Sequence, residues 1–258
     1  METITLNFWL ILLLFLTAFT AGFVDSVAGG GGLISVPVLL GIGLPPQLVL
    51  GTNKFQSSFG SFSAMMNYAG NGHVQYNRML LTGIACTLIG AAGGAFAVQR
   101  VDSRWLSMAI PWLLALIFFY LLFKPSLGER DFTPKMGHLP MFFLCGLLLG
   151  FYDGFFGPGT GNFWTLLLVI IGGMNLVRAT AHTKVMNFTS NIVSLVLFAV
   201  GGNIRFDIGL IMAVGQFSGG FCGSGMVMRK GARFIRPVFM LVVLVMVLYL
   251  FLKNYGKT

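Results

Sequence analysis

Long apolar segments alternate with short polar connections along almost the whole chain. A membrane-spanning helix needs about 20 predominantly apolar residues. The clearest such segments lie at 6–24, 79–99, 105–123, 139–152, 208–228 and 236–252. Weaker ones, which are shorter or contain polar residues, lie at 33–50, 55–70, 162–177 and 187–201. The pattern predicts an all-α, polytopic transmembrane helix bundle with about eight spans, in a range of about seven to ten.

The chain repeats itself at a nearly constant spacing. Residues 22–32 (GFVDSVAGGGG) correspond to residues 150–160 (GFYDGFFGPGT) at a shift of 128. Later segments match at shifts of 130 and then 129. The shift of 130 pairs Lys54 with Lys184. Such self-similarity indicates a duplicated architecture. We therefore predict a first transmembrane repeat at 5–124, a polar inter-repeat loop at 125–137 and a second transmembrane repeat at 138–254.

The relative orientation of the halves depends on the short segments that follow the glycines, 33–44 and 161–171. If all five apolar segments of a half span the membrane, the odd number inverts the second half. If the short segment only re-enters, four spans leave the halves parallel. Arg100 and Arg229 lie in equivalent basic loops, and basic loops collect on one side of a membrane. The charge pattern therefore favours eight spans with parallel halves.

Each half carries a glycine-rich break after its first apolar segment. Each glycine costs about 1 kcal/mol relative to alanine in a helix, and Pro158 also removes a backbone donor. We therefore expect the first helix of each half to break there and a new helix to begin. Irregular backbone persists at membrane depth only beside protein or a water-filled cavity, and helix N-termini attract anions. The predicted anion-binding residues at the breaks are Gly29, Gly30, Gly31, Gly32, Gly157, Gly159, Thr160, Gly161 and Asn162.

Close packing of helices is the alternative explanation for glycines in apolar segments. It is the better one for isolated pairs such as Gly90 and Gly94. Four consecutive glycines, matched in the other half by GPGTG, favour a broken helix instead.

Two of the seven acidic residues, Asp25 and Asp153, fall within apolar segments, and they are repeat equivalents. A carboxylate at mid-membrane costs about 2.5–3.5 kcal/mol on insertion scales, so it is retained with a partner or for transport. Two interpretations stay open and are compatible. Each aspartate caps the broken helix by accepting N–H groups of the glycine loop, or each couples proton movement to transport.

Lys54 and Lys184 follow the short segments and have polar neighbours. A lysine at the end of a span often extends its ammonium group to the membrane surface. Its repetition beside two helix N-termini offers a second interpretation, a cationic pocket for an oxyanion. The candidate binding residues here are Thr52, Asn53, Lys54, His182, Thr183, Lys184 and Asn187.

Composition excludes several classes of protein. Charged residues make up only 9% of the 258 residues and hydrophobic residues 56%, whereas soluble domains carry about 25% charged residues. The net charge of +9 is spread over short loops, which is typical of membrane topology signals, and we expect no nucleic-acid partner. The three scattered cysteines predict neither a disulfide framework nor a metal site. We expect no cofactor; the predicted partners are a small anionic substrate and the lipid bilayer, and formation of a homo-oligomer stays open.

The repeated motif resembles that of the TauE/SafE family of sulfite exporters, also called the 4-toluene sulfonate uptake permease family. The resemblance rests on residues 22–32 with Thr52-Asn53-Lys54 and on residues 150–161 with Thr183-Lys184, and it covers nearly the whole chain. The chain is most similar to the branch of probable membrane transporters. The resemblance implies a bacterial inner-membrane transporter of sulfur oxyanions, such as sulfite, sulfoacetate or other sulfonates.

Three functions can be compared on these residues. The first is a secondary transporter of a small anion, in which the glycine breaks and lysines bind the anion and Asp25 and Asp153 respond to protons. The second is a carrier or channel for Na⁺ or another cation that uses the Asp25/Asp153 pair. The third is an intramembrane enzyme, and the chain lacks the HExxH and GxSxG motifs. The sequence favours the anion transporter.

Overall fold

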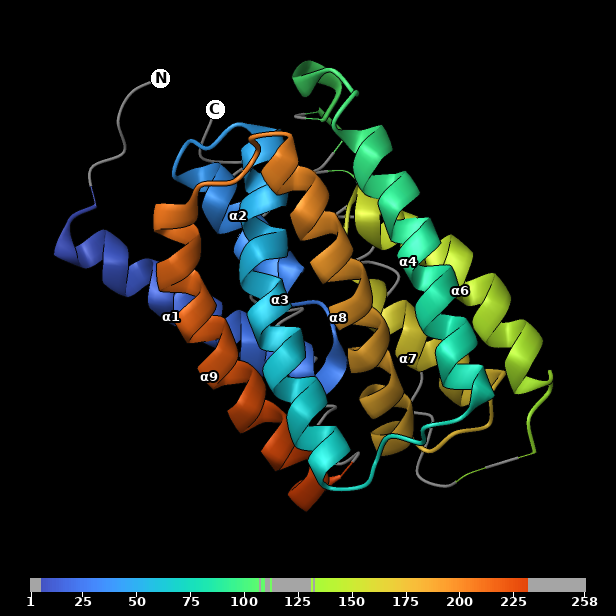
Figure 1. The fold of residues 1–258 in the computed structure, drawn as a ribbon. Coiled ribbons are helices and arrows are strands. Elements are labelled where there is room, and N and C mark those ends of the chain that lie inside the picture. The colour runs from blue at the N-terminus through green and yellow to red at the C-terminus, as the bar shows by residue number, and fades with distance from the viewer. Residues whose placement is uncertain (1–5, 107, 110–111, 113–130, 132, 232–258) are drawn as a thin grey trace.

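A computed structural model describes residues 6–106, 108–109, 112, 131 and 133–231 of the chain. This part contains eight α-helices and no strands, which confirms the predicted all-α bundle. Figure 1 shows the helices, which are α1 (Phe8–Ala28), α2 (Gly32–Gly41), α3 (Pro46–Gly70), α4 (Arg78–Val98), α6 (His138–Phe155), α7 (Thr160–Ile170), α8 (Leu176–Val200) and α9 (Phe206–Lys230). The predicted segments 236–252 and most of 105–123, and most of the polar loop 125–137, lie outside the described residues.

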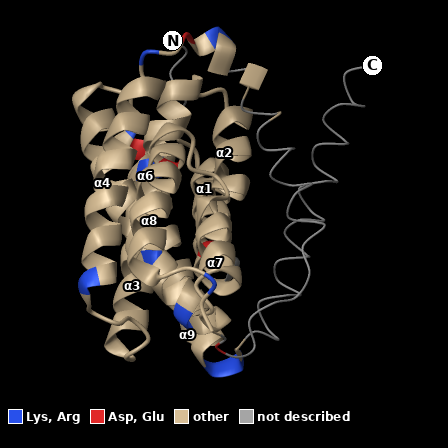
Figure 2. Cartoon of the chain, turned by 90° about the vertical axis from the view of Figure 1, so that its right-hand side faces the viewer, with Lys and Arg blue, Asp and Glu red and all other residues tan. Residues whose placement is uncertain are grey.

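Five of the described helices, α1, α4, α6, α8 and α9, are long and apolar enough to cross a membrane. Helix α3 is as long as α8, 25 residues, and both helices bury polar side chains, such as Lys54 in α3 and Lys184 in α8. The chain is therefore a multi-pass membrane protein. Figure 2 shows that charged residues lie mostly near the ends of the helices, with a few along the interior of the bundle.

Local signals in the sequence set the helix starts. The asparagines at 7, 77 and 175 precede α1, α4 and α8, and each side chain accepts the N–H of the residue three positions later. Helix α3 instead begins after Pro45 with Pro46 at its first position, where a missing N–H costs nothing. This early start differs from the weak spans predicted at 33–50 and 55–70, and it places Lys54 in the interior of α3.

Equivalent helices of the two halves run in opposite directions. The Arg205 N–H donates to Thr52 Oγ1 at 3.0 Å, so the start of α3 lies beside the end of α8. The Gln75 N–H donates to His182 Nε2 at 3.4 Å, so the end of α3 lies beside the start of α8. Helices α3 and α8 are related by the shift of 130 and are antiparallel (Figure 1).

The preference for parallel halves is therefore wrong. Helix α2 begins at the deep glycine break and returns to the end of the bundle where α1 begins, and both helices contribute to one apolar cluster there. Together α1 and α2 bring the chain back to the end where α1 begins, as two full crossings would, although the 10 residues of α2 reach only about half-way through a membrane. The equivalent basic loops after α4 and α9 consequently lie at opposite ends of the bundle, so their charges cannot indicate a common side.

Glycines allow the closest helix contacts. A Cβ atom on Gly90 would overlap the carbonyl of Leu147, and one on Gly94 would overlap the carbonyl of Phe151, so α4 and α6 pack backbone to backbone. The repeat-equivalent Gly219 lies in the same way against Phe19 of α1. Such contacts fix the position of α1 and α6, the two helices that carry the aspartates.

Candidate functional site

Each first helix ends at its glycine break, and a shorter helix begins directly after it. Gly30 has a φ of 98° and Gly157 a φ of 94°, a region that residues with a Cβ rarely adopt. Helices α2 and α7 start at Gly32 and Thr160, and neither start has a side-chain cap among the described residues. The predicted glycine-broken helices are confirmed, and two helix N-termini face the interior of the bundle.

The two lysines form ion pairs that cross between the halves. Lys54 Nζ lies 2.6 Å from Asp153 Oδ1, and Lys184 Nζ lies 2.8 Å from Asp25 Oδ2. The lysine side chains are 2% and 0% exposed, so neither reaches a membrane surface. The interpretation that they extend to the surface is wrong, because both lie inside 25-residue helices.

The two carboxylates have different second partners. Asp25 Oδ1 accepts the N–H groups of Gly30 at 3.2 Å and Gly31 at 3.3 Å. Asp153 Oδ2 instead accepts the hydroxyl of Ser190, and within the described part no backbone N–H donates to it. The first aspartate thus holds a glycine loop, and the second binds side chains of α3 and α8.

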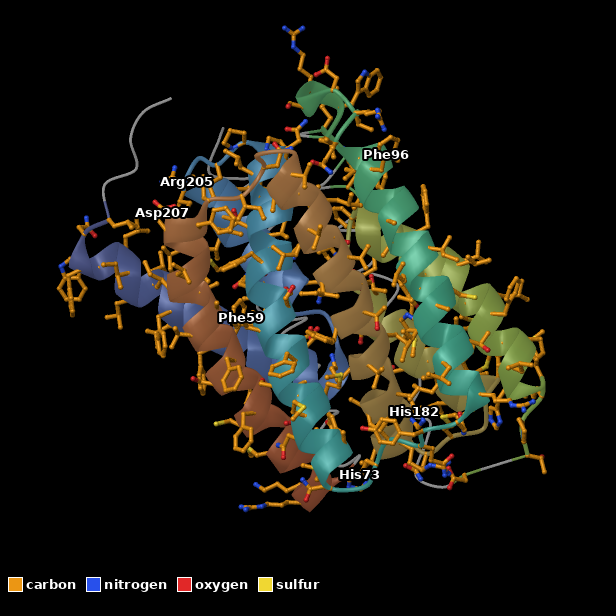
Figure 3. All side chains as sticks on the ribbon, in the orientation of Figure 1. Phe59, His73, Phe96, His182, Arg205 and Asp207 are labelled. Carbon is orange, nitrogen blue, oxygen red and sulfur yellow. The ribbon has the colours of Figure 1, made fainter. Side chains whose placement is uncertain are left out.

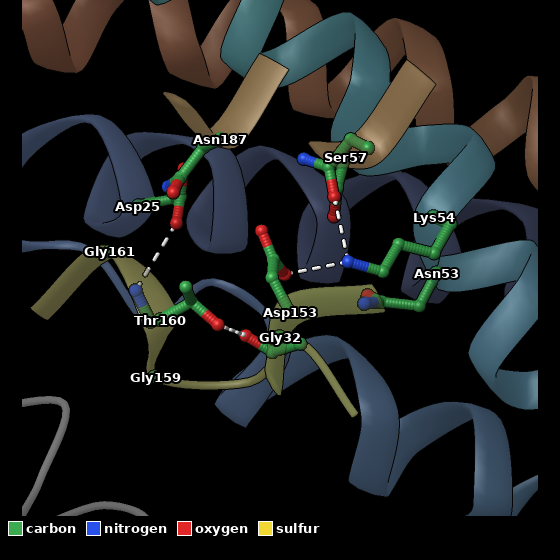
Figure 4. Close-up of a pocket in the computed structure, with 13 residues that line it drawn as sticks. Asp25, Gly32, Asn53, Lys54, Ser57, Asp153, Gly159, Thr160, Gly161 and Asn187 are labelled. Carbon is green, nitrogen blue, oxygen red and sulfur yellow. Dashed lines mark hydrogen bonds and ion pairs between the residues drawn. The ribbon is translucent and has the colours of Figure 1, made fainter. Parts of the chain in front are cut away.

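A small cavity lies between the breaks and the ion pairs (Figure 4). Its volume is about 30 Å³, enough for about two water molecules. In Figure 4, Lys54 points to Asp153, and Asp25 lies beside the loop that carries Gly159 and Gly161. The residues that line the cavity are Asp25, Gly30, Gly32, Asn53, Lys54, Ser57, Asp153, Gly157, Gly159, Thr160, Gly161, Asn187 and Asn191.

Two buried amide atoms near the cavity have no hydrogen-bond partner among the described residues. They are Asn187 Oδ1, on the cavity wall, and Asn162 Nδ2, which lies close to Gly30. Both asparagines are 6% exposed, and an unpaired buried polar atom costs about 1–3 kcal/mol. A ligand or water that both accepts and donates hydrogen bonds fits this arrangement.

The remaining predicted residues surround the cavity or lie far from it. Gly29, Gly31, Asn162 and Lys184 belong to the breaks and the ion pairs without lining the cavity, and Thr183 Oγ1 lies 3.1 Å from Thr165 Oγ1.

Thr52 and His182 lie near opposite ends of the bundle. There they accept the N–H groups of Arg205 and Gln75 and hold the loops that precede α9 and α4. Figure 3 shows His182 near His73 at one end and Arg205 near Asp207 at the other. The structure does not bring Thr52 and His182 to the cavity.

Two cavity residues were not predicted from the sequence, Ser57 and Asn191. Lys54 Nζ donates to Asn191 Oδ1 at 3.1 Å, and Ser57 lies one helical turn after Lys54 on the same face. The repeat register pairs Ser57 with the predicted Asn187, three residues after the lysine in each half. Ser57 lies three residues after Lys54, and Asn191 lies seven residues after Lys184. Residues at these spacings share a face of a helix with the lysine, so helical periodicity would have identified both.

Comparison with known proteins agrees with the geometry of a membrane transporter. The family model described as "Sulfite exporter TauE/SafE" matches residues 14–250. A "Probable membrane transporter protein YfcA" of Escherichia coli is 43% identical over 244 residues, which cover 95% of this chain and 90% of the relative. A "Probable membrane transporter protein" of Haemophilus influenzae is 42% identical over 229 residues, or 89% of each chain. No solved structure matches.

Proposed function

The chain belongs to the sulfite exporter TauE/SafE family, and from this premise we propose that it is a secondary transporter of a small anion across the bacterial inner membrane. Membership and the names of the relatives indicate a membrane transporter rather than an enzyme. The family's description supports a sulfur oxyanion or an organosulfonate as the substrate class. Relatives from several bacteria support the inner-membrane location.

The observation that carries the proposal is the cavity between two helix N-termini and the buried Lys54. Helices α2 and α7 direct the positive ends of their dipoles toward it. Thr160 and Asn53 add hydroxyl and amide groups to its wall. Backbone N–H groups, an ammonium group and amides are the donors that bind oxyanions in proteins.

An entering anion competes with the aspartates for the lysines. Two lysines and two aspartates give the site no net charge, so a bound anion adds one uncompensated negative charge. Buried unpaired charge is strongly unfavourable, and a proton that enters with the anion removes the imbalance. The site therefore supports proton-linked transport of an anion better than transport of an anion alone.

The ion pairs weaken the case for a cation carrier that uses Asp25 and Asp153. Each carboxylate already lies within 2.8 Å of a lysine nitrogen, so a Na⁺ ion between them would meet two ammonium groups. Because one-to-one transport of a proton with a monovalent anion carries no net current, uptake of the anion under a pH gradient, compared with a Na⁺ gradient, separates the two functions. We expect uptake to respond to the pH gradient and not to Na⁺.

The cavity is too small for a whole sulfonate group in the described conformation. A volume of about 30 Å³ corresponds to about two water molecules, so the walls must separate when substrate binds. The antiparallel arrangement of equivalent helices suits such a motion, because transporters with inverted repeats open the same central site alternately to each side.

Flux into proteoliposomes tests the proposal directly. A panel of sulfite, sulfoacetate, methanesulfonate and simple carboxylates is offered at an acid and a neutral pH. We expect uptake of at least one sulfur oxyanion by the wild-type protein. Lack of transport of every member of the panel would overturn the proposed function.

A double variant tests the site. Lys54→Ala with Lys184→Ala removes both ammonium groups and should abolish uptake. The matched control is Arg104→Ala with Arg229→Ala, which removes two exposed charges at opposite ends of the bundle and should keep wild-type uptake. Unchanged uptake and pH dependence in the lysine variant would refute the site while leaving the transported substrate established.

A further inference from the structure

Both oxygens of Asp25 accept hydrogen bonds from groups that can only donate. One oxygen accepts two backbone N–H groups, from Gly30 and Gly31, and the other pairs with Lys184. A backbone N–H can only donate, and hydrogen bonds of this kind favour the ionised carboxylate. A proton on Asp25 would weaken the contacts that shape the first glycine break.

Asp153 lacks one of these contacts for a reason that is visible in the sequence. At the shift of 128, Pro158 stands where Gly30 stands in the first half. Proline has no N–H to donate, so the second glycine loop cannot repeat the hydrogen bond that Gly30 makes. The partners of Asp153 in the described part are side chains, Lys54 and Ser190.

The surroundings of Asp153 can accommodate a proton. The Ser190 hydroxyl both donates and accepts, so it can rotate and accept a hydrogen bond from a protonated carboxyl group. The position equivalent to Ser190 is Gly60, which has no hydroxyl. Asp153 is also more buried than Asp25, with 6% against 18% of the side chain exposed.

We propose that Asp153 binds the proton that accompanies the anion and that Asp25 is a structural residue that holds the first glycine break. The inference rests on the proposed function. When the proton binds Asp153, Lys54 loses its ionic partner and becomes available to the anion. One proton and one monovalent anion enter together, so the two lysines remain balanced by Asp25 and the substrate.

The other charged and titratable groups around Asp153 fit this assignment. Lys54 faces it from α3, and the Asp25–Lys184 pair lies on the other side of the cavity. Tyr152, on the same helix, donates its hydroxyl to the Pro158 carbonyl at 2.7 Å and is thereby engaged elsewhere. Asp25 and Asp153 are the two carboxylates among the residues that line the cavity.

The affinity for a sulfonate at different pH values tests the inference. Methanesulfonate is the probe, because a sulfonate stays a monoanion throughout the range and any pH dependence belongs to the protein. Uptake of one proton with each anion makes the wild-type affinity fall about tenfold for each pH unit once Asp153 is ionised. Asp153→Asn should bind methanesulfonate with no pH dependence, at the affinity that the wild type shows in acid.

A pH indicator inside the proteoliposomes supplies the second measurement. The wild-type protein should move about one proton with each methanesulfonate ion, and Asp153→Asn should lose both proton movement and accumulation driven by a pH gradient. Asp25→Asn should lower the melting temperature, while the protein that remains folded keeps the pH dependence.

Ser190→Ala keeps every charge and provides a test that does not depend on the folding of the aspartate variants. It removes the hydroxyl that donates to the ionised carboxylate, a stronger hydrogen bond than one to the neutral acid, so the pH at which affinity begins to fall should move higher. A wild-type affinity independent of pH, or a pH dependence that survives Asp153→Asn and disappears in Asp25→Asn, would overturn the inference while wild-type uptake still supports the proposed function. Lack of uptake of every anion in the panel would overturn both the inference and the proposed function.

Discussion

The two halves place the same lysine–aspartate pair in unlike surroundings. In one pair, Lys54 and Asp153 are both almost completely buried and surrounded by side chains. In the other, Lys184 is buried, but Asp25 is partly exposed and bound to the backbone of a glycine loop. The sequence repeat thus contains two equivalent charge pairs, and a few differences between the halves, such as Pro158 at the position of Gly30 and Ser190 at the position of Gly60, give the pairs different surroundings.

The crossing of the pairs has a mechanical consequence. Each pair joins a lysine of one half to an aspartate of the other, so movement of one half against the other must stretch or break a pair. Breaking a buried pair is costly unless a substrate anion pairs with the lysine and a proton neutralises the aspartate. The arrangement therefore links movement of the halves to occupation of the site, which a coupled transporter requires.

The largest difference between the pairs should appear when a lysine is removed. Lys54→Met and Lys184→Met each leave a buried carboxylate without its ionic partner, which costs about 3–5 kcal/mol. The loss should be greater for Lys54→Met, because Asp25 retains two backbone donors and some solvent. Thermal unfolding in detergent measures both.

Restoring neutrality provides the control. Lys54→Met with Asp153→Asn, and Lys184→Met with Asp25→Asn, remove whole pairs, and the first should recover most of its lost stability. The second should recover less, because Asp25 also holds the loop. Equal recovery in both would show that the pairs are equivalent.

Substitution of the loop glycines examines the same contrast through the backbone. Ala at position 30 or 157 is strained by the positive φ, at about 1–3 kcal/mol. A Cβ on Gly157 would lie 3.1 Å from Lys54 Nζ and 3.3 Å from Asp153 Oδ1, whereas one on Gly30 would lie 2.9 Å from the uncharged Asn162 Nδ2. Gly157→Ala should therefore also alter anion affinity and its pH dependence, and Gly30→Ala mainly stability.

Gly43→Ala isolates the backbone contribution. Its φ is 90°, and nothing lies within 4 Å of the added Cβ. Unfolding free energies of the three variants separate conformational strain from contact. If Gly157→Ala lost no more than Gly43→Ala and bound anions normally, the second loop would not determine the properties of the Lys54–Asp153 pair.

Several parts of this picture could be predicted from the sequence. The glycine runs predicted the broken helices, because few residues adopt a positive φ and glycine weakens a helix wherever it occurs. The equivalence of Lys54 and Lys184 followed from the repeat alone. These signals are local or depend only on alignment.

The crossed pairing could not be predicted, because it depends on the direction of the halves. Charge counts suggested parallel halves, whereas the return of the short helix α2 makes them antiparallel. Lys54 falls between the predicted spans 33–50 and 55–70. In the structure, Pro45 and Pro46 set the start of α3 well before it, so that it lies inside this helix. Direction and depth come from packing, which no short motif encodes.

A smaller effect is expected from the uncharged cavity residues. Asn187 and Ser57 occupy equivalent positions in the two halves and line the cavity, and their amide N–H and hydroxyl groups can donate to a sulfonate oxygen. A hydrogen bond to substrate is worth about 0.5–1.5 kcal/mol, so Asn187→Ala should weaken methanesulfonate binding by about two- to tenfold. Ser57→Ala, with a shorter group removed, should have less effect. Titration of methanesulfonate binding measures both effects, and a larger loss of affinity for Ser57→Ala than for Asn187→Ala would contradict this order.

The smallest effect should come from the carboxylate that anchors the start of α8 outside the membrane, where the start of α3 is anchored by the uncharged Gln47. Asp131 accepts the Asn175 N–H at 2.7 Å and pairs with Arg178 at 3.1 Å. The backbone hydrogen bond and the smaller effect of the arginine charge lower the pKa of the Asp131 carboxyl group, although its partial burial opposes them. A lowered folded-state pKa contributes stability above the ordinary value, and the contribution disappears as the pH falls through the lowered one. Asp131→Ala should therefore cost less than about 1 kcal/mol at neutral pH, because the group is half exposed, and nothing in strong acid. Asp207→Ala is the control, because Asp207 pairs with Arg205 only two residues away and so does not join distant segments of the chain as Asp131 does. If the Asp131→Ala deficit in unfolding free energy persisted unchanged in acid, the carboxylate would not be the group that anchors α8.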